Sequence, residues 1–282
     1  MRKKVLNVFR YVFLSIVSFI SVFPFFWMIV AATNKSVEVT KGTMIPGTYF
    51  FENLKTLLAS DLQYVNAFKN SIIIAIVTTA LAMVVSSAAG YAFVVYKTKA
   101  RERVFNFIFL SMMVPFAALM VPLFRLFSKF SNMGPLKVIA LNTPMAVIII
   151  AIATAFLIFF FKQNAQTFPK ELIEAARIDG AHEFRIFNQI VLPLMKPAIA
   201  VQAIFTFVSS WNNYFIPSLI INRDSKKTLP ILIAQLRSAD FLKFDMGKVY
   251  MMLGCAILPV IIVYLCLSKF IVRGVTLGGV KG

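Results

Sequence analysis

The sequence has few of the residues that build an active site. Its 282 positions hold 11 acidic residues, two cysteines and one histidine. That histidine, His182, has no Cys or His neighbour at metal-ligand spacing, and no pair of acids lies within an apolar stretch. There is also no G-x-x-x-x-G-K-[ST] loop of the kind that holds nucleotide phosphates. We therefore predict no catalytic centre, no metal site and no ATP hydrolysis by this chain alone.

Apolar residues, in contrast, are abundant. Hydrophobic residues make up 60% of the chain and charged residues only 14%, a composition typical of integral membrane proteins. A membrane-spanning helix needs about 20 mainly apolar residues. We expect an all-α integral membrane protein, with a single transmembrane domain over 1–282, a long polar loop at 162–196 and a C-terminal tail at 273–282. The six runs long enough to span a membrane are 11–32, 70–96, 105–127, 138–161, 198–221 and 249–272.

Basic residues at the ends of these runs predict the orientation. Four lie within 2–10 and four more within 97–103, the short link between the second and third runs. Because Lys and Arg concentrate on the cytoplasmic side, we expect both termini and the loop 162–196 to be cytoplasmic, although the bases in 222–248 run against this trend. The net charge of +18 is spread over many loops rather than one compact face. We therefore expect contact with membrane lipid and none with nucleic acid.

The apolar runs also bear on the source of energy for transport. None of the six contains Asp or Glu, whereas carriers driven by proton or sodium gradients need ionisable groups at membrane depth. A polytopic chain without such groups and without a nucleotide site is expected to be driven by a partner. The alternative is a partner-independent secondary carrier or channel for small polar solutes.

The loop 162–196 has the pattern of two short helices. Thr167 and Pro169 predict the start of the first, and Gly180 predicts its end, because glycine readily takes the left-handed conformation of a helix terminus. A second helix is expected over about 181–190. Its apolar face is predicted from helical spacing and comprises Phe184, Phe187, Val191 and Leu194. The simplest alternative is an ordinary amphipathic helix that lies on lipid headgroups.

The same loop carries a resemblance to a known family. Glu174-Ala175-Ala176 is followed by Gly180 and then, after nine residues, by Ile190-Val191-Leu192-Pro193. This spacing resembles the signature loop of permease subunits of binding-protein-dependent ABC importers. Asn213 departs from that family's pattern, since many relatives have an acid there. Segments elsewhere are similar to the six-helix subunit of maltose-type and multiple-sugar importers, namely 23–28, 210–214, 228–230 and 273–282.

The resemblance implies a type I ABC importer permease fold and a heteromeric complex. This chain would form half of a pathway that imports sugars, with oligosaccharides favoured. Its partners would be a second homologous permease chain, two cytoplasmic ABC ATPase subunits and an extracellular sugar-binding protein. ATP and Mg²⁺ would bind to the ATPases, and this chain would hold no cofactor. The location implied is the plasma (inner) membrane of a bacterium or archaeon.

The resemblance also assigns candidate residues. Those expected to couple the permease to an ATPase are Glu174, Ala175, Ala176, Asp179, Gly180, Ala181, Phe184 and Arg185. Further ATPase contacts would be Gly278, Gly279 and Lys281, unless this end is a disordered tail. Candidates for the translocation path are Trp211, Asn212, Asn213 and Tyr214, because amides bind hydroxyls and aromatic rings stack on the C–H faces of sugars. Alternatively, these amides bond neighbouring helices and the rings pack at a helix interface.

Overall fold

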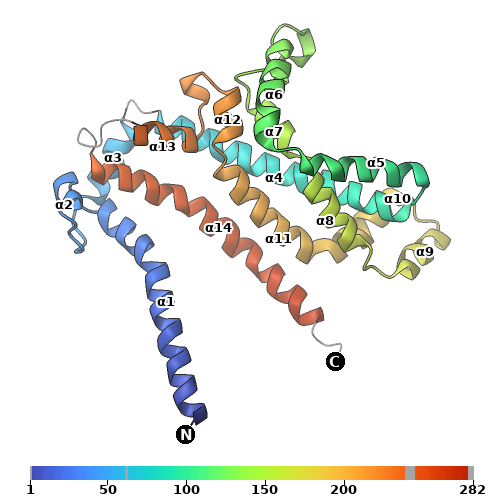
Figure 1. The fold of residues 1–282 in the computed structure, drawn as a ribbon, viewed down its shortest axis with the longest axis horizontal. Helices are drawn as coiled ribbons and strands as arrows, with labels where there is room; N and C mark the ends of the chain where they lie inside the picture. The colour runs from blue at the N-terminus through green and yellow to red at the C-terminus, as the bar shows by residue number, and fades with distance from the viewer. Residues whose placement is uncertain (1, 61–62, 239–244, 279–282) are drawn as a thin grey trace. The chain divides into compact units, whose positions relative to one another are not determined.

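The structure is a computed structural model that describes residues 2–60, 63–238 and 245–278. Every regular element in these ranges is helical (Figure 1), so the expected all-α class is confirmed. Short 3-10 turns occur at η1 (Ser111–Met113), η2 (Gly134–Ile139) and η4 (Asp224–Lys226), and a π turn at η3 (Phe187–Val191). The α-helices are α1 (Arg2–Ala32), α2 (Ser36–Thr40), α3 (Phe50–Leu58), α4 (Tyr64–Val95), α5 (Lys99–Leu110), α6 (Phe116–Phe130), α7 (Pro144–Ala151), α8 (Ala155–Ala165), α9 (Lys170–Ile178), α10 (Glu183–Ile186), α11 (Leu192–Trp211), α12 (Phe215–Ile220), α13 (Leu229–Ser238) and α14 (Met246–Gly278).

Several helices have the length and composition of membrane spans. Two bent pairs, α5 with α6 at 105° and α7 with α8 at 42°, bring the number of possible spans to six if each pair crosses as one. Helix α14 continues to Gly278, into the segment that we expected to be a tail. The continuous spans in the described part of the chain are Leu6–Ala32, Tyr64–Val95, Glu183–Trp211 and Met246–Ile271.

The third and fourth apolar runs are interrupted, which the expected ranges 105–127 and 138–161 did not show. Val114 leaves the helical conformation, with ψ 116°, and Pro115 follows it. Proline has no N–H and disfavours helical backbone in the residue before it, so α6 begins in a new direction. Between α7 and α8, the hydroxyl of Thr154 accepts a hydrogen bond from the first turn of α8 and thereby caps a new helix.

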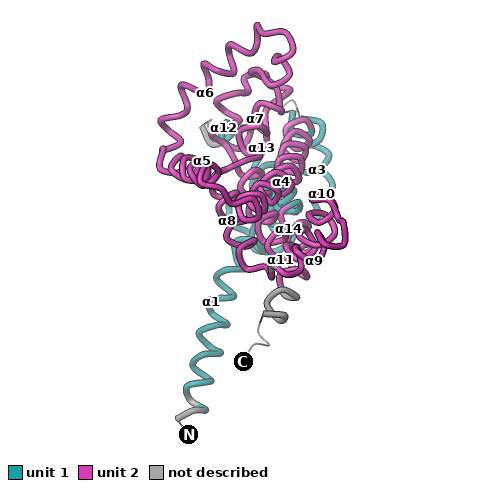
Figure 2. Tube along the Cα trace, turned by 90° about the vertical axis from the view of Figure 1, so that its right-hand side faces the viewer, with its two compact units in different colours: residues 1–65, 234–259 teal, residues 66–233, 260–282 magenta. Residues whose placement is uncertain are grey.

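The chain divides into two compact units (Figure 2). Unit 1 comprises residues 1–65 and 234–259, and unit 2 comprises 66–233 and 260–282.

In unit 1, buried amides hold the end of α1. The Nδ2 atom of Asn53 on α3 donates to the carbonyl oxygens of Ala32 at 2.9 Å and Asn34 at 3.0 Å. The Nδ2 atom of Asn34 donates in turn to the carbonyl of Ile45 at 3.0 Å. The last carbonyls of a helix have no partner inside it. These side chains supply partners and fix the path of the segment that follows α1.

Unit 2 is held by two apolar cores. One lies among α4, α8, α9, α10 and α11 and includes Phe161 and Ile186, both fully buried. The other lies among α4, α6, α7 and α12 and includes Phe127 and Ile220. Because lipid is as apolar as these side chains, helices in a membrane associate through close packing rather than through exclusion from water.

Gly90 permits the close approach of α4 and α8. A Cβ atom at this position would lie 2.6 Å from the backbone nitrogen of Lys162 and 2.6 Å from the carbonyl carbon of Phe161. Both of those atoms belong to helix backbone, so they cannot move aside as a side chain could. Any larger residue would therefore push the two helices apart.

We expect Gly90→Ala to lower the melting temperature of the purified protein in detergent, because overpacking of this kind costs about 1–3 kcal/mol. The matched control is Gly254→Ala in α14, where a Cβ would meet nothing within 4 Å. The control should leave stability unchanged or raise it, since alanine is favoured over glycine in a helix by about 1 kcal/mol. Equal melting temperatures for the two variants would contradict the tight crossing.

Candidate functional site

The loop 162–196 forms a short helical hairpin at one end of unit 2, where α9 and α10 lie side by side (Figure 1). Pro169 occupies the N-cap position of α9. The expected cap by Thr167 is wrong, because its Oγ1 atom donates to the carbonyl of Asn164 at 2.7 Å instead. The helix thus begins two residues closer to Gly180 than a cap at Thr167 would place it.

The turn after α9 is a Schellman motif centred on Gly180. This residue has φ +78°, a conformation that costs an L-residue with a side chain about 1–2 kcal/mol. The N–H of Gly180 donates to the carbonyl of Arg177, and that of Ala181 to the carbonyl of Ala176, both at 3.0 Å. These two bonds satisfy carbonyls at the end of α9. Gly180 therefore ends the helix as predicted and sets the direction in which α10 leaves.

A π turn, η3, joins α10 to α11 and changes which side chains face inward. A π turn adds one residue to the helical period, so Ile186, Val191 and Met195 all point into the core of unit 2 and are fully buried. Phe184, in contrast, is 74% exposed. The predicted apolar face with Phe184 and Val191 on one side is therefore wrong, because regular helical spacing does not hold across η3.

The eight residues predicted to couple to an ATPase do not share one surface. Ala176 and Ala181 are half-buried and pack against the core of unit 2. Arg185 donates from Nε to Oε1 of Gln189 at 3.0 Å. Glu174 forms no hydrogen bond or ion pair with any side chain that the structure describes. The members exposed on the hairpin are Glu174, Ala175, Asp179, Gly180, Phe184 and Arg185.

The hairpin also exposes an apolar residue that was not among the eight predicted. Ile178, the last residue of α9, is 86% exposed. With Phe184 it places two large apolar side chains on a short hairpin that also exposes Glu174. Both side chains are available for contact with another surface. The available signal in the sequence was an apolar residue directly before Asp179-Gly180, at a helix end where polar residues are common.

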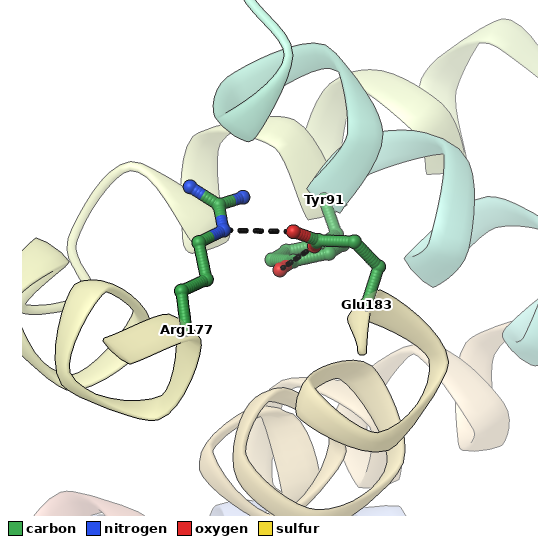
Figure 3. A network of polar contacts seen from close by, with 3 residues as sticks. All are labelled: Tyr91, Arg177 and Glu183. Carbon is green, nitrogen blue, oxygen red and sulfur yellow. Dashed lines mark hydrogen bonds and ion pairs between the residues drawn. The ribbon is translucent and has the colours of Figure 1, made fainter. Parts of the chain in front are cut away.

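An ion pair within the hairpin and a hydrogen bond from α4 meet at one carboxylate (Figure 3). The Nε atom of Arg177, on α9, donates to Oε1 of Glu183, at the start of α10, at 2.7 Å, and the hydroxyl of Tyr91 on α4 donates to Oε2 at 3.2 Å. The hydrogen bond with Glu183 raises the pKa of Arg177 above its ordinary value. The two side chains are 40% and 39% exposed, so the pair contributes little stability. One carboxylate is thus shared by side chains of α9 and α4.

The residues predicted for the translocation path separate in the structure. Trp211 is buried, and its ring lies 6.0 Å from that of Phe207 and 5.6 Å from that of Phe68. Trp211 therefore fills the interior of unit 2. Asn212 is exposed at the C-cap of α11 and Tyr214 is exposed beside α12. Asn213 lines a cavity of about 260 Å³.

The remaining predictions concern the C-terminus and metals. Gly278 is the last residue of α14, whereas Gly279 and Lys281 lie outside the described residues. The described part of the chain contains no group of three or more His, Cys, Asp or Glu residues that could hold a metal ion.

Comparison with known proteins gives consistent matches over almost the whole chain. Residues 88–277 match the family model described as "Binding-protein-dependent transport system inner membrane component". The chain is 38% identical over 282 residues to the lactose transport system permease protein LacG of Rhizobium radiobacter, with 100% of this chain and 98% of LacG covered. It is 37% identical over 273 residues to the arabinooligosaccharides transport system permease protein AraQ of Halalkalibacterium halodurans, with 94% and 93% covered.

A solved structure shares the fold. In a crystal structure of a bacterial ABC transporter involved in the import of the acidic polysaccharide alginate, one chain superposes on this one with a TM-score of 0.79 at 21% identity. The alignment covers 95% of this chain and 97% of that chain.

We expect Gly180→Ala to loosen the hairpin, because alanine is strained at φ +78° and the Schellman bonds would weaken. Hydrogen–deuterium exchange should become faster across 170–186. The control is Gly42→Ala, which puts alanine at φ +76° in unit 1, where a Cβ likewise meets nothing within 4 Å. The control should lose similar stability but leave exchange at 170–186 unchanged. Unchanged exchange there in Gly180→Ala would refute the role given to this turn.

Proposed function

Because the chain belongs to the family of binding-protein-dependent transport system inner membrane components, we propose that it is the permease subunit of an ATP-driven importer of sugars. As a member of this family it is a multi-pass membrane transport component and not an enzyme. The observation that carries the sugar assignment is full-length similarity to permeases of lactose and arabinooligosaccharide transport systems. Oligosaccharides are the favoured cargo.

The proposed complex contains four kinds of subunit. This chain and a second, homologous permease chain form the two halves of the pathway, and two ATPase subunits bind ATP and Mg²⁺ on the cytoplasmic side. A separate extracellular protein delivers the sugar. Both termini and the hairpin of α9 and α10 face the cytoplasm, as the basic residues at 2–10 and 97–103 favour.

The hairpin has the properties needed to transmit motion from an ATPase. Its outer surface presents Glu174, Ile178 and Phe184, which suits a groove with an apolar floor and a basic rim. Its inner surface is anchored by Ile173 and Ile186 in the core of unit 2. A displaced hairpin would therefore move with α4 and α11 rather than bend away from them.

The ion pair completes this linkage. Because Glu183 bonds both Arg177 and Tyr91, the angle between α9 and α10 is fixed relative to α4. Closure of the two ATPases on ATP would draw the hairpins of the two permease chains together. The result would be a rigid-body rotation of one permease half against the other, a common form of switching in proteins.

Native mass spectrometry of the chain, purified gently from its own membranes, tests the proposed complex. We expect one copy of this chain with one copy of a different permease and two ATPase copies, because family membership implies partners that the chain itself does not contain. Recovery of the chain alone, or only as a homo-oligomer, would overturn the importer assignment in favour of a self-sufficient carrier.

We expect Glu174→Lys to leave membrane insertion intact but to weaken ATPase binding, because it reverses the charge on the outer surface of α9. ATPase affinity should fall by at least about tenfold, which corresponds to about 1.4 kcal/mol, and sugar uptake should be lost. The control is Glu52→Lys, the same charge change at an exposed position on α3 in unit 1. Normal uptake by the Glu174 variant, measured with matched protein levels, would exclude the hairpin as the coupling element.

A further inference from the structure

Unit 2 contains a cavity of about 260 Å³ between α4, α7, α8 and α11. This volume is far larger than the roughly 10–15 Å³ that a single water molecule requires, and it is large enough for a sugar ring. Polar and apolar side chains line it. Amides and hydroxyls come mainly from α11, with Thr78 added from α4. Aromatic rings come from Phe156 and Phe205, and aliphatic side chains come from α7 and α8.

One polar side chain that lines this cavity is buried without a hydrogen-bond partner. Thr78 is 1% exposed, and its Oγ1 atom has no hydrogen bond. A helical threonine commonly donates to the carbonyl four residues earlier, as Thr79 does to Ala75 at 2.7 Å. A buried polar group without a partner is costly, so the Thr78 hydroxyl is placed to bond something that enters the cavity. Gln202, which is 5% exposed, lines the same cavity with its amide.

The lining indicates the charge of that ligand. None of the described residues around the cavity is acidic or basic. Amides and hydroxyls both donate to and accept from neutral hydroxyl groups, and aromatic rings such as those of Phe156 and Phe205 can pack on the C–H faces of a sugar ring. A carboxylate or phosphate would in contrast be desolvated here without a cation to pair with it, which is strongly unfavourable.

We propose that this cavity is a solute subsite for uncharged, polyhydroxylated ligands, and that through it this chain favours neutral sugars over acidic ones. The inference rests on the proposed function, because it assumes that the chain forms half of a sugar pathway. It adds a specific site and a charge preference that similarity cannot supply, since the same fold occurs in a transporter of the acidic polysaccharide alginate.

The position of Gln202 along α11 supports a place on the pathway. Gln202 lies nine residues before Trp211, where the continuous span Glu183–Trp211 ends, and therefore about 14 Å along the helix from that end. That distance is about half of a hydrocarbon core roughly 30 Å thick. Solute sites of membrane transporters are commonly found near this depth. The lining extends from Gln202 to Asn213 and so overlaps the Trp211–Tyr214 segment that the sequence predicted for the path.

The test uses the complete transport system in cells that lack other sugar importers. Uptake is measured with radiolabelled lactose, maltotriose and arabinotriose as neutral probes and with trigalacturonate and glycerol 3-phosphate as acidic probes. Thr78→Val keeps the shape of the side chain and removes the unpaired hydroxyl. Thr79→Val makes the same change one position away, at a hydroxyl that is bonded within its own helix. Gln202→Leu is a second variant at the subsite.

We expect uptake of a neutral probe by the wild type. Its KM should rise about two- to tenfold in Thr78→Val, as loss of one hydrogen bond implies, and at least as much in Gln202→Leu. Thr79→Val should match the wild type. Melting temperatures of the purified complexes establish that each variant is folded, and Thr78→Val should not be less stable than the wild type.

Three results would overturn the subsite. The first is preferential uptake of an acidic probe, and the second is equal KM values for Thr78→Val and Thr79→Val. The third is a more stable Thr78→Val complex with unchanged uptake, which is expected if lipid or a partner side chain fills the cavity. Failure of the proposed function is distinguishable from all three. In that case none of the probes enters the cells and no ATPase is recovered with the wild-type chain.

Discussion

Every backbone N–H and C=O group that enters the lipid must find its hydrogen-bond partner within the protein, because the bilayer core offers none. This constraint accounts for the uniformly helical described chain and for the few places where its helices stop. The break before α6 occurs at Pro115, which has no N–H to satisfy, and α8 starts at a threonine cap. At the end of α1, the amide of Asn53 bonds the carbonyls of Ala32 and Asn34. Polar side chains thus stabilise the termini that the membrane would otherwise penalise.

The same constraint makes an unsatisfied polar group informative. Some hydroxyls on the long helices donate to their own backbone, as those of Thr79 and Ser87 do. Thr78 differs, because its hydroxyl is buried without a partner and borders a cavity that Gln202 also lines. The hairpin lies at the other end of α11. The turn at Gly180 and the bond between Arg177 and Glu183 define its shape, and Ile178 is left exposed. One subunit therefore combines a surface suited to a partner with an interior suited to a polar solute.

Much of the fold was predictable because composition and run length are properties of the sequence alone. The runs expected at 11–32, 70–96 and 249–272 overlap continuous spans of the structure, whereas the run at 198–221 extends ten residues beyond the span Glu183–Trp211. Gly180 was identified as a helix end because its conformation is a local requirement. The interruption at Pro115 was missed, since membrane helices often tolerate proline and only packing decides whether the helix bends or breaks. The face of the second hairpin helix was also missed, because the π turn at η3 changes the period on which that prediction relied.

The sequence by itself determined the membrane class, the polar loop and the motif that identifies the family, because each depends on residues close together in the chain. Only the tertiary structure decided which motif residues are exposed, and it turned Ala176 inward while leaving Glu174 free of described partners. It also brought Tyr91 to Glu183 across 92 positions and grouped hydroxyls and amides from separate helices around one cavity. Such contacts depend on how helices cross and in which register they pack, which the spacing of residues along one helix does not specify.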